Sequence, residues 1–290
     1  MHIDSRGWLS VAEIVIFSPC ILVSFILCSR HGFGRSSGWF YTLLLCVVRV
    51  VGAGCQLYTY HEHSAGLLKT TIILDTVGLS PLLLAALGLL SRLVDSINRS
   101  GRGLLGVRHF RLLQTVIGVA MILSIIGGVS AKSDGASIKP PTMSKVGALL
   151  FIPGFIGILF FCARACTNTS YAETGERRLG LAVAIALPFI LVRLAYTELT
   201  TFLHNKDFNS VDGKLLFTVI LSVLPELVVV LNFLVVGFTI PILGADLQGP
   251  ILGRGRKESN RRGATAEEQH SLYQYQYLAH AENPNPSGRY

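Results

Sequence analysis

Seven apolar stretches, each long enough to cross a lipid bilayer as an α-helix, dominate the sequence. A helix rises about 1.5 Å per residue, so a hydrocarbon core of about 30 Å takes about 20 apolar residues. A backbone in lipid must satisfy its own hydrogen bonds, so we expect an all-α, multi-pass membrane protein. The predicted spans are Trp8–Ser29, Gly38–Thr59, Thr70–Ser91, Phe110–Val129, Val146–Cys166, Leu179–Phe202 and Leu215–Ile242.

Composition and the C-terminal segment complete this division of the chain. The 290 residues are 51% hydrophobic and 14% charged, whereas soluble domains average about 25% charged residues. These values exclude a soluble globular protein and disorder over most of the length. The last 47 residues differ, because they hold six Lys or Arg, five Asp or Glu and no long apolar run. We therefore predict a seven-helix transmembrane domain at residues 1–243 and a disordered cytosolic tail at residues 244–290.

The distribution of basic residues predicts the orientation in the membrane. Sixteen Lys or Arg residues fall in the tail and in the loops on its side, and seven fall on the opposite side. Because cytosolic loops carry the excess of Lys and Arg, we expect a cytosolic C-terminus and an exoplasmic or lumenal N-terminus. The net charge of +8 then faces anionic headgroups. Membrane lipids are therefore expected partners, and nucleic acid is not.

The two halves of the sequence resemble each other. Arg49 lies 32 residues before Pro81, and Arg193 lies 32 residues before Pro225. Spans one and five also share a spacing of 11 residues between a proline and a following arginine. We predict a parallel internal repeat of two three-helix units in a 3+1+3 arrangement, with span four as the connector. Chance similarity between Leu- and Val-rich segments is the alternative.

Six ionisable side chains fall inside the predicted spans, where each costs about 2.5–3.5 kcal/mol at the helix centre on an insertion scale. Such residues face the interior of a bundle and find partners there. From their positions along the spans, three are expected near the outer face and three near the midplane, which leaves the inner third apolar. The shallow three are Glu13, Asp75 and Glu198, and the deep three are Arg49, Arg193 and Glu226.

Charge counting among these residues indicates a chemically active carboxyl group. Four carboxylates face two guanidiniums, so we expect at least one carboxyl to keep its proton at pH 7 and to be able to donate it. Glu226, deep in span seven, is the first candidate for a catalytic acid, and Asp75 is the second. The candidates for substrate binding or structural ion pairs are Arg49, Arg193, Gln56, Glu13 and Glu198.

A purely structural role for the charged residues is the alternative. Arg49 and Arg193 would then lock the helices together by pairing with Asp75 and Glu226. The sequence shows no metal-ligand spacing and no cofactor motif, so we expect neither a metal nor a cofactor. No Lys lies inside a predicted span, which excludes a retinal Schiff base.

The chain resembles a largely uncharacterised fungal family of seven-span membrane proteins in its span-two arginine, the spacing from Asp75 to Pro81 and its Pro225-Glu226 pair. It is also similar in size and topology to membrane-bound terpene cyclases of fungal meroterpenoid pathways. That resemblance implies a secondary-metabolism enzyme that protonates a farnesyl epoxide or olefin, with a lipophilic small molecule as its substrate. A looser likeness is to fungal lipid-translocating-exporter-like proteins.

A cyclase of this kind requires a neutral carboxylic acid in a dry cavity with walls that can face a carbocation. Asp75 or Glu226 would be the acid. A small-molecule or lipid transporter, favoured by the predicted repeat, and a seven-span receptor are the alternatives; the sequence does not fix the oligomeric state. The expected aromatic wall residues are Tyr58, Tyr196, Phe189 and Phe233.

Overall fold

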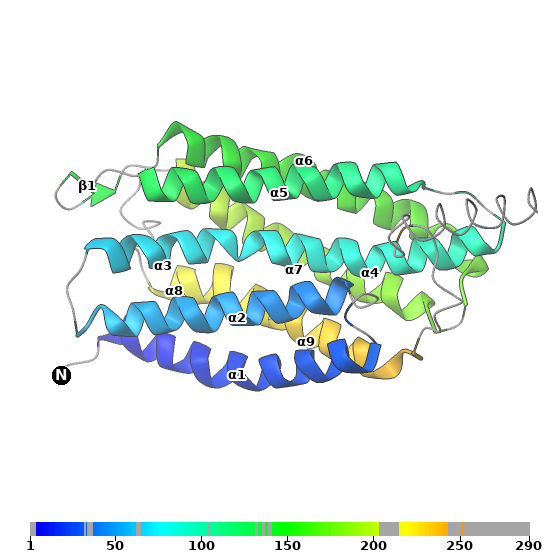
Figure 1. Cartoon of the computed structure of the whole chain (residues 1–290), viewed down its shortest axis with the longest axis horizontal. Helices are drawn as coiled ribbons and strands as arrows, with labels where there is room; N and C mark the ends of the chain where they lie inside the picture. Colours follow the sequence, from blue (N-terminus) through cyan, green and yellow to red (C-terminus); the bar gives the residue numbers. More distant parts are fainter. Residues whose placement is uncertain are drawn as a thin grey trace, which may run out of the picture. The chain divides into compact units, whose positions relative to one another are not determined.

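The fold is taken from a computed structural model (Figure 1). It divides the chain into two compact units, Met1–Leu252 and Gly253–Tyr290. All helices below belong to the first unit, and the predicted tail at 244–290 lies outside the described residues except for Ile251. The structure describes residues 4–31, 33, 37–61, 65–101, 103, 105–130, 133–134, 137–138, 141–173, 175–202, 215–242 and 251.

The described residues are helical apart from short connections, which confirms the all-α prediction. A two-residue antiparallel pair, β1 (Ser133–Asp134) and β2 (Ser137–Ile138), and a 3-10 turn, η1 (Thr169–Tyr171), lie in connections. The helical elements are α1 (Ser5–His31), α2 (Ser37–Tyr58), α3 (Ala65–Val77), α4 (Leu79–Arg99), α5 (Val107–Ser130), α6 (Thr142–Cys166), α7 (Arg177–Phe202), α8 (Leu215–Thr218), the π-helical turn η3 (Val219–Val223) and α9 (Leu224–Thr239).

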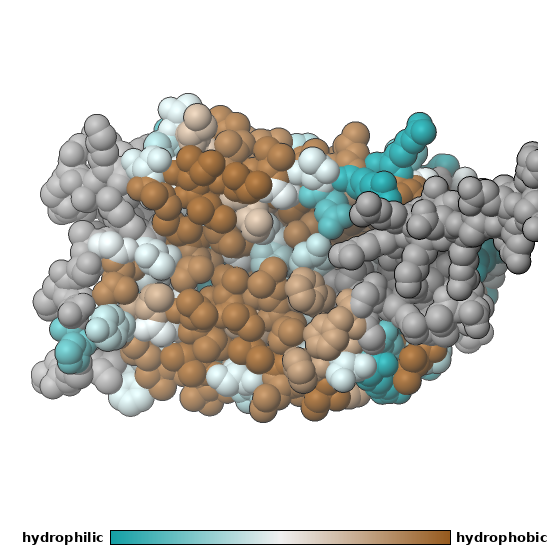
Figure 2. All heavy atoms as spheres, viewed as in Figure 1, coloured by the Kyte–Doolittle hydropathy of each residue, from teal (hydrophilic) through white to brown (hydrophobic). Residues whose placement is uncertain are grey.

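Among the described residues, seven helical segments are long and apolar enough to cross a membrane. Consecutive elements form two of these segments: α3 and α4 meet at Gly78, and α8, η3 and α9 follow one another without a gap. Large apolar side chains such as Val15, Leu22, Leu112 and Val235 are exposed on the outside of the bundle. Figure 2 shows the resulting brown belt, with teal residues gathered toward one end. The chain is therefore a multi-pass membrane protein by helix length, composition and surface.

Two helix boundaries differ from the sequence prediction in a way that matters for the site. The first helix begins at Ser5 instead of Trp8. The helix of span three continues to Arg99, eight residues beyond the predicted end at Ser91. It continues because its charged residues are held by partners inside the protein, as described below, so they do not force the helix to end in water.

Helix α4 lies at the centre of the packing, since 18 of its 21 residues are buried and it contacts α2, α5, α6 and α7. Around it, α1 packs on α2, α5 on α6, and α7 on α9. Helices α5 and α6 approach each other closely at Gly147, where a Cβ atom would lie 2.6 Å from Ser124 Oγ. Small residues allow this approach in membrane bundles. The 3+1+3 arrangement and the internal repeat stay predictions.

Candidate functional site

One buried carboxylate joins two arginines from different helices. Glu226, in the first turn of α9, has no exposed surface. Arg49 on α2 donates from Nε to its Oε2, and Arg193 on α7 donates from Nε to its Oε1, both at 2.5 Å. Both oxygens of Glu226 are thus acceptors for guanidinium groups. With both oxygens engaged and no surface exposed, Glu226 is not placed to donate a proton to a substrate, the role for which it was the first candidate.

Asp75 closes the same network from α3. Its Oδ1 lies 3.1 Å from Arg49 Nη1 and 3.2 Å from Arg193 Nη2. Its backbone carbonyl oxygen also accepts a hydrogen bond from Arg193 Nη2, at 2.6 Å. The predicted pairing of two arginines with two carboxylates is confirmed, and each arginine contacts both carboxylates. Two positive and two negative charges therefore balance within hydrocarbon, which offsets the cost of burying them.

The π-helical turn η3 supplies a residue that the sequence analysis missed. Ser222 Oγ accepts a hydrogen bond from Arg49 Nη2 at 2.9 Å and donates to Asp75 Oδ1 at 3.3 Å. Pro225 lacks an N–H and therefore cannot make the ordinary helical bond at this place; π-helical turns often occur at functional sites. The only sequence signal was this proline. We call Arg49, Asp75, Arg193, Ser222 and Glu226 the Arg49 cluster.

Glu13 adds a fifth ionisable group beside the Arg49 cluster. Its Oε1 lies 3.8 Å from Arg49 Nη1, too far for a hydrogen bond, and the residue is 9% exposed. Glu13, expected near the outer face, thus lies beside Arg49, which was expected near the midplane, and α1 begins at Ser5, three residues before the predicted start. Among the described residues, this long contact is the single ion pair that Glu13 makes. The cluster and Glu13 together carry one carboxyl group more than they carry guanidiniums.

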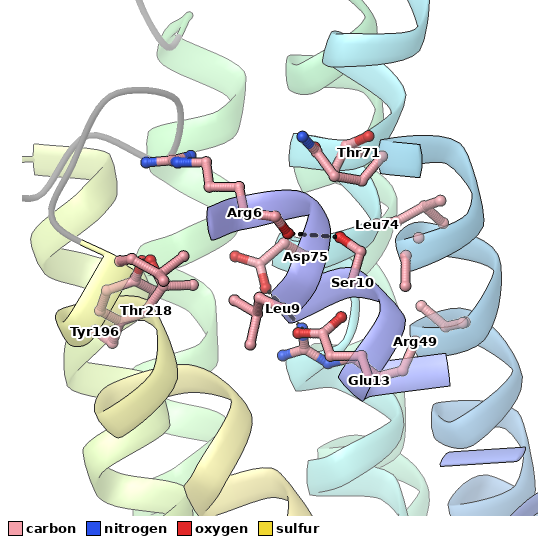
Figure 3. A pocket seen from close by; sticks show the side chains of 15 residues that line it. Arg6, Leu9, Ser10, Glu13, Arg49, Thr71, Leu74, Asp75, Tyr196 and Thr218 are labelled. Carbon is pink, nitrogen blue, oxygen red and sulfur yellow. Dashed lines mark hydrogen bonds and ion pairs between the residues drawn. The ribbon is translucent and has the colours of Figure 1, made fainter. Parts of the chain in front are cut away.

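A cavity of about 130 Å³ lies against Glu13 and the Arg49 cluster. Its walls come from α1, α2, α3, α7 and α8. Figure 3 shows Arg6, Ser10 and Glu13 on successive turns of α1 along one wall, with Asp75 and Arg49 beyond them. Gln56, a predicted binding residue, also lines the cavity, as do Thr71, Tyr196 and Thr218. The cavity thus reaches from the first turns of α1 to the buried charges.

Several predicted site residues lie elsewhere. Glu198 does not line the cavity, and its two carboxylate oxygens are buried without a hydrogen-bond partner among the described residues. Of the four aromatic side chains expected as cavity walls, Tyr196 lines the cavity. Tyr58 is half exposed and Phe233 is buried in the apolar core. One of the four expected aromatic rings therefore contributes to the cavity wall, beside aliphatic side chains and the carboxyl groups of Glu13 and Asp75.

A second buried ion pair lies toward the other end of the bundle. Arg92 on α4 is 3% exposed and donates to Glu176, just before α7, from Nε at 3.0 Å and from Nη2 at 2.6 Å. Arg92 Nη2 also donates to the carbonyl oxygen of Pro241, at 2.9 Å. The prediction that the inner third of the bundle is apolar is wrong. Its error came from ending span three at Ser91, which assigned Arg92 to a loop.

His31 and Trp39 complete this second group, which we call the Arg92 cluster (His31, Trp39, Arg92 and Glu176). The two rings stack at 4.5 Å between centroids. His31 Nε2 lies 3.2 Å from the Gly237 carbonyl oxygen, so this nitrogen carries the proton, and Nδ1 can accept from Arg92 Nη1 at 3.5 Å. Trp39 Nε1 donates to the Phe233 carbonyl oxygen at 3.2 Å. Residues that precede α5 are thereby tied to residues that follow it.

Comparison with known families shows which family the chain belongs to but does not assign it an activity. A family model described as "Domain of unknown function (DUF7702)" matches residues 3–242. The chain belongs to this family. The matched range covers the seven spans of this chain. No protein of curated function and no solved structure matches the chain. The family description carries neither the fungal nor the terpene-cyclase resemblance.

Proposed function

We propose that this chain is a membrane carrier that binds a small polar solute in the cavity beside Glu13. The observation that supports the proposal is the cavity itself, which extends to a buried, charged cluster built from both halves of the sequence. Transporters bind their substrates near the bilayer midplane, between the two halves of the protein. Charged residues inside a membrane bundle are expensive and mark such pathways.

The Arg92 cluster supports the same proposal from the opposite end of the bundle. Arg92, His31 and Trp39 all precede α5, and they hold Glu176 and the α9 backbone, which follow it. None of the four cluster members lines the cavity. A solute site reached from one end, with the halves tied together at the other, is what one state of an alternating-access carrier requires.

The distribution of basic residues gives the carrier a direction. The side predicted as cytosolic holds sixteen Lys or Arg residues against seven on the other side. The N-terminal ends of α1 and α3 lie at the same end of the bundle (Figure 1). Arg6, in the first turn of α1, and Thr71 of α3 line the cavity. We infer that the N-terminus is exoplasmic or lumenal, that the C-terminus is cytosolic, and that the cavity faces the exoplasmic or lumenal side.

The terpenoid cyclase of fungal secondary metabolism is the second candidate, and Glu13 is the observation that favours it. With Glu226 and Asp75 both bound to arginines, Glu13 is the carboxyl group in the cavity that would have to protonate an epoxide or olefin. Two features favour the carrier. The cavity of about 130 Å³ is smaller than the roughly 300–1,000 Å³ of pockets for drug-sized ligands. Its lining also includes hydroxyl and amide groups that would capture a carbocation, from Ser10, Gln56, Thr71 and Thr218.

Flux and cyclisation can be measured on the same preparation. The full chain would be reconstituted into liposomes and offered labelled amines, amino acids, sugars and carboxylates, and in parallel a farnesylated epoxide. A carrier gives saturable uptake of at least one polar class, and Gln56→Leu, in the cavity wall, reduces that uptake while Glu198→Gln, outside the wall, does not. Cyclised product without saturable uptake would establish the enzyme, and absence of saturable uptake for every class would contradict the carrier.

A further inference from the structure

We propose that the cavity is selective for a small organic cation that bears N–H groups, a primary ammonium or a guanidinium, held between the carboxylates of Glu13 and Asp75. This inference rests on the proposal that the cavity is a binding site, and it names the chemical class of the ligand. It follows from which polar atoms of the cluster are already occupied and which still face the cavity.

The hydrogen-bond donors of the cluster are directed at protein partners. Arg49 uses Nε for Glu226, Nη2 for Ser222 and Nη1 for Asp75. Arg193 uses Nε for Glu226, Nη1 for Thr197 and Nη2 for Asp75. Every guanidinium nitrogen therefore already has a protein partner. An anionic solute would have to break these buried contacts, so the two arginines do not form an anion site.

The acceptors of the cluster are the atoms that still face the cavity. The side-chain contacts of Asp75 that the structure records all fall on Oδ1, and its side chain is 25% exposed, against 0% for Glu226. Among the described residues Glu13 makes no hydrogen bond, and its contact with Arg49 is 3.8 Å long. Both carboxylates line the cavity (Figure 3). Two carboxyl groups with accepting oxygens left over match a ligand with several N–H donors.

The charge count of the Arg49 cluster and Glu13 favours the same sign of ligand. The Arg49 cluster contains two guanidiniums and two carboxylates, so an ionised Glu13 leaves one uncompensated negative charge. A monovalent cation in the cavity cancels it. Besides Glu13, Asp75 and Arg49, the charged residue that lines the cavity in the described part of the chain is Arg6, seven residues before Glu13 and so about 10 Å away along α1. Its guanidinium points away from Glu13 (Figure 3).

The volume of the cavity and the polar groups that line it narrow the class of ligand further. A cavity of about 130 Å³ exceeds the space that one water needs and falls below the volume of pockets for drug-sized ligands. The amide of Gln56 and the hydroxyl of Thr71 are further cavity-lining groups that can accept N–H donors. A quaternary ammonium has no N–H group, and the wall offers it a single aromatic ring, Tyr196.

Ligand-dependent stabilisation tests this selectivity without requiring transport. The full chain in lipid nanodiscs would be melted in the presence of increasing methylammonium, guanidinium, tetramethylammonium, sodium or acetate, because a ligand that binds the folded state raises the melting temperature in a saturable way. We expect methylammonium and guanidinium to do so and the other three not to. Glu13→Gln should weaken methylammonium binding at least tenfold. Glu198→Gln, a span carboxyl outside the cavity, should leave it within twofold.

Each other outcome overturns the inference. Equal methylammonium affinity in wild type and Glu13→Gln, both shown to be folded by their melting transitions, would exclude the site. Stabilisation by acetate would show an anion site, and equal stabilisation by sodium would show an inorganic ion site. Glu13→Asp serves as the conservative variant and should bind more tightly than Glu13→Gln. Cation binding without flux would refute the carrier alone, and flux of a neutral solute without cation binding would refute this inference alone.

Discussion

The two buried ion-pair clusters of this bundle are both built from arginines and carboxylates, but they differ in the number of charges, in their contacts and in access to the cavity. In the Arg92 cluster one arginine meets one glutamate through several hydrogen bonds, and the neighbouring rings of His31 and Trp39 cover it. In the Arg49 cluster two arginines meet two carboxylates, and a further carboxyl group, Glu13, lies beside a cavity. The first has equal charges and no member in the cavity wall. The second is also balanced, but its members Arg49 and Asp75 line the cavity together with the additional carboxyl group of Glu13.

This difference teaches which feature of a buried charge points to binding. Burial and pairing are common to both clusters, so neither feature distinguishes a site from a structural contact. What distinguishes the Arg49 cluster is a group whose bonding capacity the protein leaves unused, facing open space. The two clusters should therefore differ in how much stability is lost when a member is removed, and in whether they can be reached from the cavity.

The largest effect is expected from removing the shared carboxylate of the Arg49 cluster. Glu226→Leu leaves Arg49 and Arg193 without the acceptor that both use. Breaking a buried pair by removing one member costs about 3–5 kcal/mol, and here two guanidiniums lose their partner. We expect a large fall in melting temperature or a failure to fold in detergent. A melting temperature close to that of wild type would show that the two arginines do not depend on Glu226.

Removing one member of the Arg92 cluster should cost less, and the loss should be recoverable. Glu176→Leu leaves one buried guanidinium, which still has the Pro241 carbonyl oxygen as an acceptor, so we expect a loss near the lower end of about 3–5 kcal/mol. Adding Arg92→Leu removes the unpaired charge and should restore most of the stability, because apolar replacement of a buried pair is often neutral. Thermal melts of the single and double variants measure this. A double variant less stable than the single one would contradict a structural role.

The seven spans could be predicted because helix length and hydropathy are local properties. Their starts and ends were less accurate where a charged residue has a distant partner. Arg92 looked like a loop residue because its acceptor, Glu176, lies 84 positions away. The earlier start of α1, at Ser5, likewise shows a helix that extends beyond the apolar run beginning at Trp8. Span boundaries near charges depend on tertiary contacts, which hydropathy does not report.

Most residues of the candidate site could be predicted from the sequence, but their arrangement could not. The free-energy cost of a charged side chain inside a membrane was enough to predict that four residues lie in the interior and have partners there. The structure brings these residues together: Arg49, Asp75, Arg193 and Glu226. Which carboxyl group keeps spare bonding capacity was not predictable, because that depends on distances across helices. Ser222 carried no signal of its own, since a serine in an apolar span is ordinary.

A smaller effect is expected where α9 packs against the Arg92 cluster. A Cβ atom at Gly237 would lie 2.5 Å from Trp39 Nε1 and 2.8 Å from Leu27 Cδ1. Gly237→Ala should therefore cost about 1–3 kcal/mol through overpacking. Gly54→Ala on α2 is the matched control, because nothing lies within 4 Å of its Cβ position and alanine favours the helix by about 0.5–1 kcal/mol. Equal melting temperatures for the two variants would mean that α9 does not pack closely on Trp39.

The smallest effect on stability is expected from Glu13→Gln, although its effect on binding is large. Glu13 has one long contact, to Arg49, so the isosteric change removes no hydrogen bond and should cost less than the ~3–5 kcal/mol expected for breaking a buried pair. A thermal melt without ligand measures this value. A loss comparable to that of Glu226→Leu would place Glu13 among the structural members of the Arg49 cluster.

The central claim, that one cluster is reached from a cavity and the rest of the core is not, can be tested by cysteine accessibility. Ala53 lines the cavity, and Ala86 lies in the fully buried core of α4. In a background with the six native cysteines replaced, Ala53→Cys and Ala86→Cys would be treated from each side of the membrane with a charged, membrane-impermeant thiol reagent. Ala53→Cys should react from the side of the N-terminus alone, and Ala86→Cys from neither side. An unreactive Ala53→Cys, or equal labelling of both positions, would contradict the presence of a solute pathway at Glu13.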